Sequence, residues 1–224
     1  VEGMKYILEE ISSVLSKANQ GLATLEKYRA RLDEVSARLT ALEFAGGAAL
    51  YDVLAALQRA ELVTRMTVEV ERQIIELGSE GRLIEMQLEE LVVGVFAERA
   101  AILRDYSTAD NEADLGRATG ELAGLEHQEL LDFGRLAELL GYDRKTNTLD
   151  FPVTPRGFRA LSRVPRLPRL AAEKVVAHFG DLDAILAASD SDVEAVEGVG
   201  EAHAIEIREG LRRLQDVDLV DRYP

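Results

Sequence analysis

The chain has 224 residues, with 26 Lys and Arg against 41 Asp and Glu, so its formal net charge is −15. This acidity counts against a nucleic-acid binder, because the phosphate backbone is neutralised by Lys and Arg. The absence of cysteine excludes disulfides, thiol catalysis and Cys-ligated metal centres. Aromatic residues make up only 5 %, so the core must consist mainly of Leu, Val, Ile and Ala, which favours helices.

The first half of the chain has the pattern of two long helices. From Ile7 to Leu42 apolar residues recur about every 3.5 positions, which is typical of a coiled-coil-like helix. Gly46 and Gly47 then interrupt the pattern, and a second amphipathic stretch runs from residue 50 to residue 77. Two long helices joined by a short glycine turn predict an antiparallel hairpin.

Shorter helical segments follow at about 82–93, 95–105 and 127–140, with a polar, weakly patterned link at 107–124. No stretch shows convincing strand alternation. Four of the five prolines lie between positions 152 and 168, and proline ends or starts helices rather than continuing them. The sequence therefore predicts an all-α protein with a long-helix spine over residues 1–150 and a second domain over residues 151–224.

The second domain contains an internal repeat at an offset of 32 residues. Val164-Pro165-Arg166-Leu167-Pro168 aligns with Val196-Glu197-Gly198-Val199-Gly200. After each motif, apolar residues continue at helical spacing, with Ala172 matching Ala204, Val175 matching Ile207 and Phe179 matching Leu211. A duplicated helix, tight turn, helix unit explains these matches.

The second copy has the glycine spacing of helix-hairpin-helix DNA-binding motifs. Its two glycines permit a close backbone approach, and the N–H groups of the turn and of the next helix's first residues form an anion site for a phosphate. Backbone contacts read no base, so the expected binding is independent of sequence. An ordinary helix-breaking turn is the alternative, which the duplication disfavours. The expected backbone donors are Gly198, Val199, Gly200, Glu201 and Ala202.

The first copy departs from the motif, because Arg166 and Pro168 stand where glycines are expected. Proline has no N–H to donate, so this hairpin is expected to contact DNA through Arg side chains. Residues 151–178 carry a net charge of +5, and three of their arginines recur at helical spacing, which predicts one basic helix face. Alternatively, those arginines pair with the acidic run at 179–207. The side chains expected to supply positive charge are Arg156, Arg159, Arg163, Arg166, Arg169, Lys174, Arg208 and Arg212.

The residues give no sign of a metal or catalytic site. His127, His178 and His203 are far apart in sequence and lack partners at metal-ligand spacing, so surface or helix-cap roles are expected. The acidic pairs at 181/183 and 190/192 are ordinary helix N-cap signals.

The hairpin residues belong to a set of motifs that extends over the whole chain. The set resembles the bacterial DNA integrity scanning (DisA) family. Its further members are Leu15-Ser16-Lys17-Ala18-Asn19-Gln20, Leu25-Glu26-Lys27-Tyr28, Leu32-Asp33-Glu34-Val35, Glu76-Leu77-Gly78, Gly81-Arg82-Leu83, Leu139-Leu140-Gly141-Tyr142 and Pro155-Arg156-Gly157-Phe158.

The resemblance implies a diadenylate cyclase with three parts. In that family an N-terminal domain condenses two ATP to cyclic di-AMP with a divalent metal, Mg or Mn, and a helical linker forms a spine. A C-terminal helix-hairpin-helix domain binds DNA, and branched DNA suppresses the cyclase. The Asp-Gly-Ala and Arg-His-Arg motifs of the nucleotide site are absent here. We therefore expect this chain to lack the catalytic domain, with residues 1–5 as the last trace of that domain. We expect the chain alone to have no cyclase activity and to bind no cofactor.

The expected function is structure-sensing DNA binding, independent of base sequence, coupled through the spine to a diadenylate cyclase domain. Expected partners are branched or junction DNA, the cyclase domain of the full-length protein, and a second copy through the long helix. The alternative is a helical protein-interaction scaffold whose acidic surface repels DNA, and a third interpretation is retained cyclase activity. With no secretory or membrane-spanning segment, we expect a cytoplasmic, nucleoid-associated protein.

Overall fold

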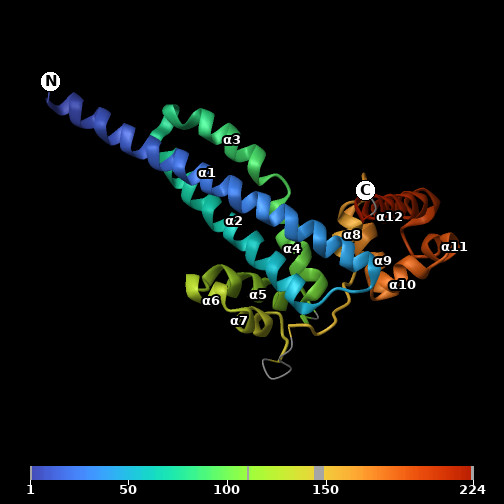
Figure 1. The fold of residues 1–224 in the computed structure, drawn as a ribbon. Helices are drawn as coiled ribbons and strands as arrows, with labels where there is room; N and C mark the ends of the chain where they lie inside the picture. The colour runs from blue at the N-terminus through green and yellow to red at the C-terminus, as the bar shows by residue number, and fades with distance from the viewer. Residues whose placement is uncertain (1, 110, 144–148, 223–224) are drawn as a thin grey trace. The chain divides into compact units, whose positions relative to one another are not determined.

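The computed structural model describes residues 2–109, 111–143 and 149–222, and its regular elements are all helices (Figure 1). Within this part of the chain, strand-like pairing is confined to an isolated antiparallel bridge between Ala49 and Pro152. The all-α prediction is confirmed for the described residues, and residues 1, 110, 144–148, 223 and 224 of the predicted domains lie outside them. The α-helices are α1 (Glu2–Ala45), α2 (Leu50–Leu77), α3 (Arg82–Val92), α4 (Val95–Tyr106), α5 (Glu112–Gly124), α6 (His127–Leu131), α7 (Phe133–Leu139), α8 (Phe158–Ser162), α9 (Arg169–Phe179), α10 (Leu182–Ala187), α11 (Asp190–Glu194) and α12 (Gly200–Arg222).

The chain divides into two compact units. The first consists of residues 1–34 and 58–99, and the second of residues 35–57 and 100–224. Helices α1 and α2 therefore contribute residues to both units. The domain boundary near residue 150 stays a prediction.

In the first unit, α1 and α2 pack closely against each other (Figure 1). A Cβ on Gly21 of α1 would lie only 2.9 Å from Cγ2 of Val70 in α2, so the glycine permits this approach. Leu25 and Leu32, two of the repeating apolar residues of α1, are buried there, whereas Ile7 near the start of the helix is 56 % exposed. This packing is what the 3.5-residue repeat predicts for a long helix with one apolar face.

An arginine of α1 completes the end of α3 in the same unit. The guanidinium of Arg29 donates hydrogen bonds to the carbonyl oxygens of Leu91 at 2.9 Å and Val93 at 2.8 Å. The last carbonyls of a helix have no intrahelical donor, and a cation also interacts favourably with the negative end of the helix dipole. Arg29 therefore ties the C-terminal end of α3 to α1.

In the second unit, the segment expected to be a polar link is helical. Helix α5 covers most of residues 107–124, and its N-cap Asn111 accepts a hydrogen bond from the backbone N–H of Asp114 at 2.9 Å. The predicted helix at 127–140 is instead divided in two. Asp132 ends α6 and caps α7 by accepting from the N–H of Gly134 at 2.8 Å. Polar capping residues thus explain both the helix in the predicted link and the division of the predicted helix at 127–140.

The proline-rich segment meets the start of α2. The N–H of Leu50 donates to the carbonyl of Phe151 at 2.9 Å, and the N–H of Tyr51 donates to that of Leu149 at 2.8 Å. The first N–H groups of a helix have no intrahelical acceptor, so this segment satisfies two donors that would otherwise be unpaired.

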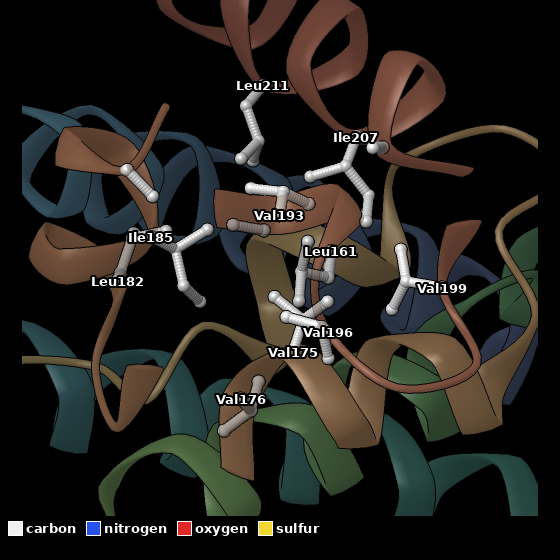
Figure 2. Close-up of a cluster of buried hydrophobic side chains, with 13 residues drawn as sticks. Leu161, Val175, Val176, Leu182, Ile185, Val193, Val196, Val199, Ile207 and Leu211 are labelled. Atoms are coloured by element: carbon white, nitrogen blue, oxygen red, sulfur yellow. The ribbon is translucent and has the colours of Figure 1, made fainter. Parts of the chain in front are cut away.

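Helices α8 to α12 share one hydrophobic core, drawn in Figure 2. Residues 32 positions apart occupy equivalent buried places: Val164 and Val196 are both buried, as are Val175 and Ile207. A Cβ on Gly210 would lie 2.8 Å from a methyl of Val164, so this glycine lets α12 pack against the turn after α8. The repeat in the sequence is matched by burial at these two pairs, whereas Ala172 and Phe179 are half-buried and their counterparts Ala204 and Leu211 are buried.

Candidate nucleic-acid interface

The second turn, residues 195–199 between α11 and α12, has the backbone that its glycines predict. Gly198 and Gly200 have φ angles of 83° and 67°, in the left-handed region that favours glycine. Val199 lies between them and is buried, which anchors the turn to the core. Gly198, Gly200, Glu201 and Ala202 are exposed, and the first N–H groups of α12 have no intrahelical acceptor. The predicted donor at Val199 is wrong, because its N–H donates to the carbonyl of Val196 at 3.0 Å inside the turn. The other four positions present backbone donors to solvent.

A lysine from the first copy of the repeat lies beside this turn. The Lys174 ammonium, on α9, occupies the space that a Cβ on Gly198 would fill. Lys174 is exposed, and within the described ranges it forms no ion pair. The structure thus brings a free positive charge next to the exposed N–H groups of the second turn.

His203, which sequence analysis assigned to a surface or cap role, also lies at the start of α12. Its Nδ1 is 2.8 Å from the carbonyl oxygen of Val199, four residues earlier. The contact holds the ring against the second turn. The separation of four residues on a helix is the sequence signal for this contact.

The first turn, residues 163–168 between α8 and α9, repeats this geometry only in part. Arg166 has a φ of 63°, the only positive value among the non-glycine residues that the structure describes. It stands at the position equivalent to Gly198 and is exposed. Pro168 has a φ of −62° and serves as the N-cap of α9. The first turn therefore presents the Arg166 side chain but no N–H at the position of Gly200.

The predicted basic face formed by Arg156, Arg159 and Arg163 does not exist, because all three side chains are used inside the second unit. Arg156 lies before α8 and donates to the carbonyls of Ser107 and Ala109, both at 3.1 Å. Arg159 is 1 % exposed and pairs with Glu43. Arg163 is half-buried and donates to Thr40. The alternative expectation, that these arginines pair with the acidic run at 179–207, stays a prediction.

The remaining predicted cations are exposed to different degrees. Arg169 pairs with Glu173 at 2.7 Å, and the hydrogen bonds from Arg169 and Arg104 hold the pKa of Glu173 below its usual value. Arg208 pairs with Asp190 at 2.9 Å. Arg212 is exposed and has no ion pair with the residues that the structure describes.

A buried polar cluster that sequence analysis did not single out holds α8 in place. Asp105 of α4 accepts hydrogen bonds from the backbone N–H groups of Gly157, Phe158 and Arg159. Burial raises the pKa of Asp105 to about 7, although these three N–H groups oppose the shift. Burial and the neighbouring Glu43 carboxylate also raise the pKa of Tyr106.

Within the described ranges, no group of three or more His, Cys, Asp or Glu side chains is arranged to hold a metal ion. Likewise, no described helix is both long and apolar enough to cross a bilayer.

Comparison with known proteins identifies the family. The model of the DisA bacterial checkpoint controller linker region matches residues 8–149, more than half of the chain. The chain belongs to the DisA family. It is 47 % identical over 226 residues to the DNA integrity scanning protein DisA of Streptomyces griseus, and 43 % identical over 224 residues to that of Frankia alni. Both matches cover 100 % of this chain, but only 60 % and 62 % of those DisA proteins. The chain therefore spans about three fifths of the length of these curated relatives.

Proposed function

We propose that residues 151–224 form a tandem helix-hairpin-helix domain that binds DNA without reading its sequence and senses branched or damaged structure. The observation that carries this proposal is the second turn, where two left-handed glycines expose backbone N–H groups and Lys174 adds a positive charge. The name of the DisA relatives, DNA integrity scanning protein, supports the same function.

In this proposal a phosphate oxygen accepts hydrogen bonds from among the N–H groups of Gly198, Gly200, Glu201 and Ala202. Charge-assisted hydrogen bonds of this kind contribute about 1.5–3 kcal/mol each when well placed. Lys174 offsets the repulsion from the exposed Glu197 and Glu201, whose carboxylates are not needed as ligands. Arg166 and Arg212 are the further cations proposed to contact the backbone. A site with so few cations binds DNA weakly, in the range of about 10⁻⁴ to 10⁻⁶ M at physiological salt.

The rest of the proposal concerns the whole DisA protein. Residues 1–150 serve as the helical linker that couples DNA binding to a diadenylate cyclase domain, which makes cyclic di-AMP from ATP with Mg or Mn. The match of residues 8–149 to the DisA linker region supports this role. DNA, the cyclase domain and a second copy of the chain are the proposed partners, and the proposed location is the cytoplasm, at the nucleoid.

The test compares Lys174→Gln with Lys17→Gln, which makes the same change on an exposed part of α1. Binding to a four-way junction is measured by fluorescence anisotropy over a series of salt concentrations. Loss of one phosphate contact should weaken binding by about tenfold and reduce the slope of log K against log[salt] by about 0.9. Lys17→Gln should leave affinity and slope unchanged.

The alternative, a protein-interaction scaffold, predicts a different result. In that case the wild-type chain shows no junction binding even at low salt, where the phosphate term is strongest. Equal binding by wild type and Lys174→Gln would instead exclude Lys174 as a DNA contact.

A further inference from the structure

Helix α8 is too short to be stable alone, and its position depends on buried carboxyl groups from two other helices. It has five residues, whereas isolated helices in water need about 12–15. Asp105 of α4 accepts the N–H groups of Gly157, Phe158 and Arg159 at 2.8, 2.6 and 2.8 Å. One carboxylate therefore satisfies three backbone donors at the start of α8.

The second anchor is the Arg159 side chain, which reaches from α8 to α1. Its guanidinium pairs with Glu43 and also donates to the hydroxyl oxygen of Ser36 at 3.1 Å and of Thr40 at 3.3 Å. The other carboxylate oxygen of Glu43 accepts from the Tyr106 hydroxyl at 2.6 Å. Glu43 and Arg159 are 2 % and 1 % exposed, so water cannot replace a lost partner.

A buried ion pair of this kind stabilises the fold only while both of its members are present. Removing one member of a buried ion pair leaves an unpaired charge in the interior, whereas replacing both members by neutral side chains of similar size costs little. We propose that Glu43 and Arg159 form an electrostatic latch that holds α8 on α1 and opens as one unit, beside the anchor that Asp105 provides on α4.

The latch links the start of the hairpin region to the C-terminal end of α1. Arg163 follows α8 directly and opens the first turn, and Phe44, next to Glu43, packs against the core shared by α8 to α12. A displacement of the first turn should therefore also move the C-terminal end of α1, because these contacts join the two. The latch is a property of the fold and does not depend on the proposed DNA binding.

Hydrogen exchange of the full chain without DNA tests the latch. The variants are Glu43→Gln, Arg159→Met and the double variant. Arg213→Met is the matched control, because Arg213 of α12 lies in the same unit and forms an ion pair with Glu209 in which both side chains are exposed. Each single latch variant should speed exchange in residues 36–43 and 157–163 together, by at least about tenfold. The control should change neither segment by more than about twofold.

The double variant decides the outcome even where a single variant fails to fold. It should fold and exchange more slowly in both segments than either single variant, because no unpaired charge remains. If the two single effects simply multiply in the double variant, or if one segment responds without the other, Glu43 and Arg159 do not act as one latch. Single variants that exchange like the wild type would overturn the proposal as well.

Discussion

Arg166 adopts in the first turn the left-handed backbone that Gly198 adopts in the second, with φ angles of 63° and 83°. A side chain with a Cβ pays about 1–2 kcal/mol for this conformation, whereas glycine adopts it freely. The chain therefore keeps an arginine at a position whose backbone favours glycine. Exposure of this arginine at the turn is consistent with the proposed contact to a DNA phosphate.

The strain at Arg166 predicts that Arg166→Gly is more stable than Arg166→Ala by about 1 kcal/mol, although both remove the same charge. Arg169, at the first position of α9, is the matched control. There the order should reverse, because glycine destabilises a helix relative to alanine. Urea unfolding of the four variants gives the free energies; a Gly variant less stable than the Ala variant at both positions would contradict the strain.

Gly157 predicts a larger effect, because its backbone and its surroundings both exclude a side chain. Its φ is 116°, and a Cβ would lie 2.9 Å from Cδ1 of the buried Ile185. We expect Gly157→Ala to lower the free energy of unfolding by about 2 kcal/mol or more. Gly120→Ala, inside α5 with open space around it, should raise stability by about 0.5–1 kcal/mol. Thermal unfolding of the two variants should therefore shift in opposite directions.

Burial raises the pKa of Asp105 from 3.8 to about 7, which predicts a particular pH dependence. The folded state then binds a proton that the unfolded state has released between about pH 4 and pH 7. This contribution to stability is present below pH 4 and is lost as pH rises to 7. Glu43, Arg159 and Tyr106 are the charged or titratable groups around this carboxyl group.

Comparison with Asp105→Asn isolates this contribution from that of the other carboxylates. Between pH 5 and 7 the free energy of unfolding of the wild type minus that of the variant should fall as pH rises. This slope is expected even if the asparagine lowers stability by a constant amount at every pH. Urea unfolding at half-unit pH intervals measures the difference. Parallel curves for the two proteins would show that Asp105 is ionised throughout.

Arg29 predicts a local effect in the first unit. Arg29→Met keeps the length of the side chain but removes the donors to the carbonyls of Leu91 and Val93. We expect a loss of about 0.5–1.5 kcal/mol and faster hydrogen exchange near the end of α3. Arg31→Met removes only an exposed pair with Glu34 and should change stability by less than about 0.5 kcal/mol. Equal effects of the two substitutions would rule out a specific role for Arg29 at this helix end.

The long helices were predictable because their apolar repeat is strong and Gly46 ends it. The difference at α5 arises from Asn111, whose side chain caps a helix with a weak apolar pattern. Asp132 likewise caps α7 inside a stretch whose apolar spacing alone predicts one helix. Capping depends on single polar residues, so a periodic pattern misses it.

For the candidate site, the glycine turn was predictable from local spacing, but the partners of the arginines were not. Arg159 was expected to face DNA and instead faces Glu43, which lies 116 residues earlier in the chain. A signal was present on α1, where Ser36 and Glu43 lie in line with the buried Leu32 and Leu39. Polar residues on a buried helix face indicate an internal partner, but they do not say which one.

The long sequence separation of Glu43 and Arg159 also has a consequence for the DisA family as a whole. An unpaired charge at either position is costly in the interior, so the two positions should change together in evolution. We expect relatives with a neutral residue at one position to carry a neutral residue at the other. Such paired substitutions would show that the buried ion pair has constrained both positions during the evolution of the family.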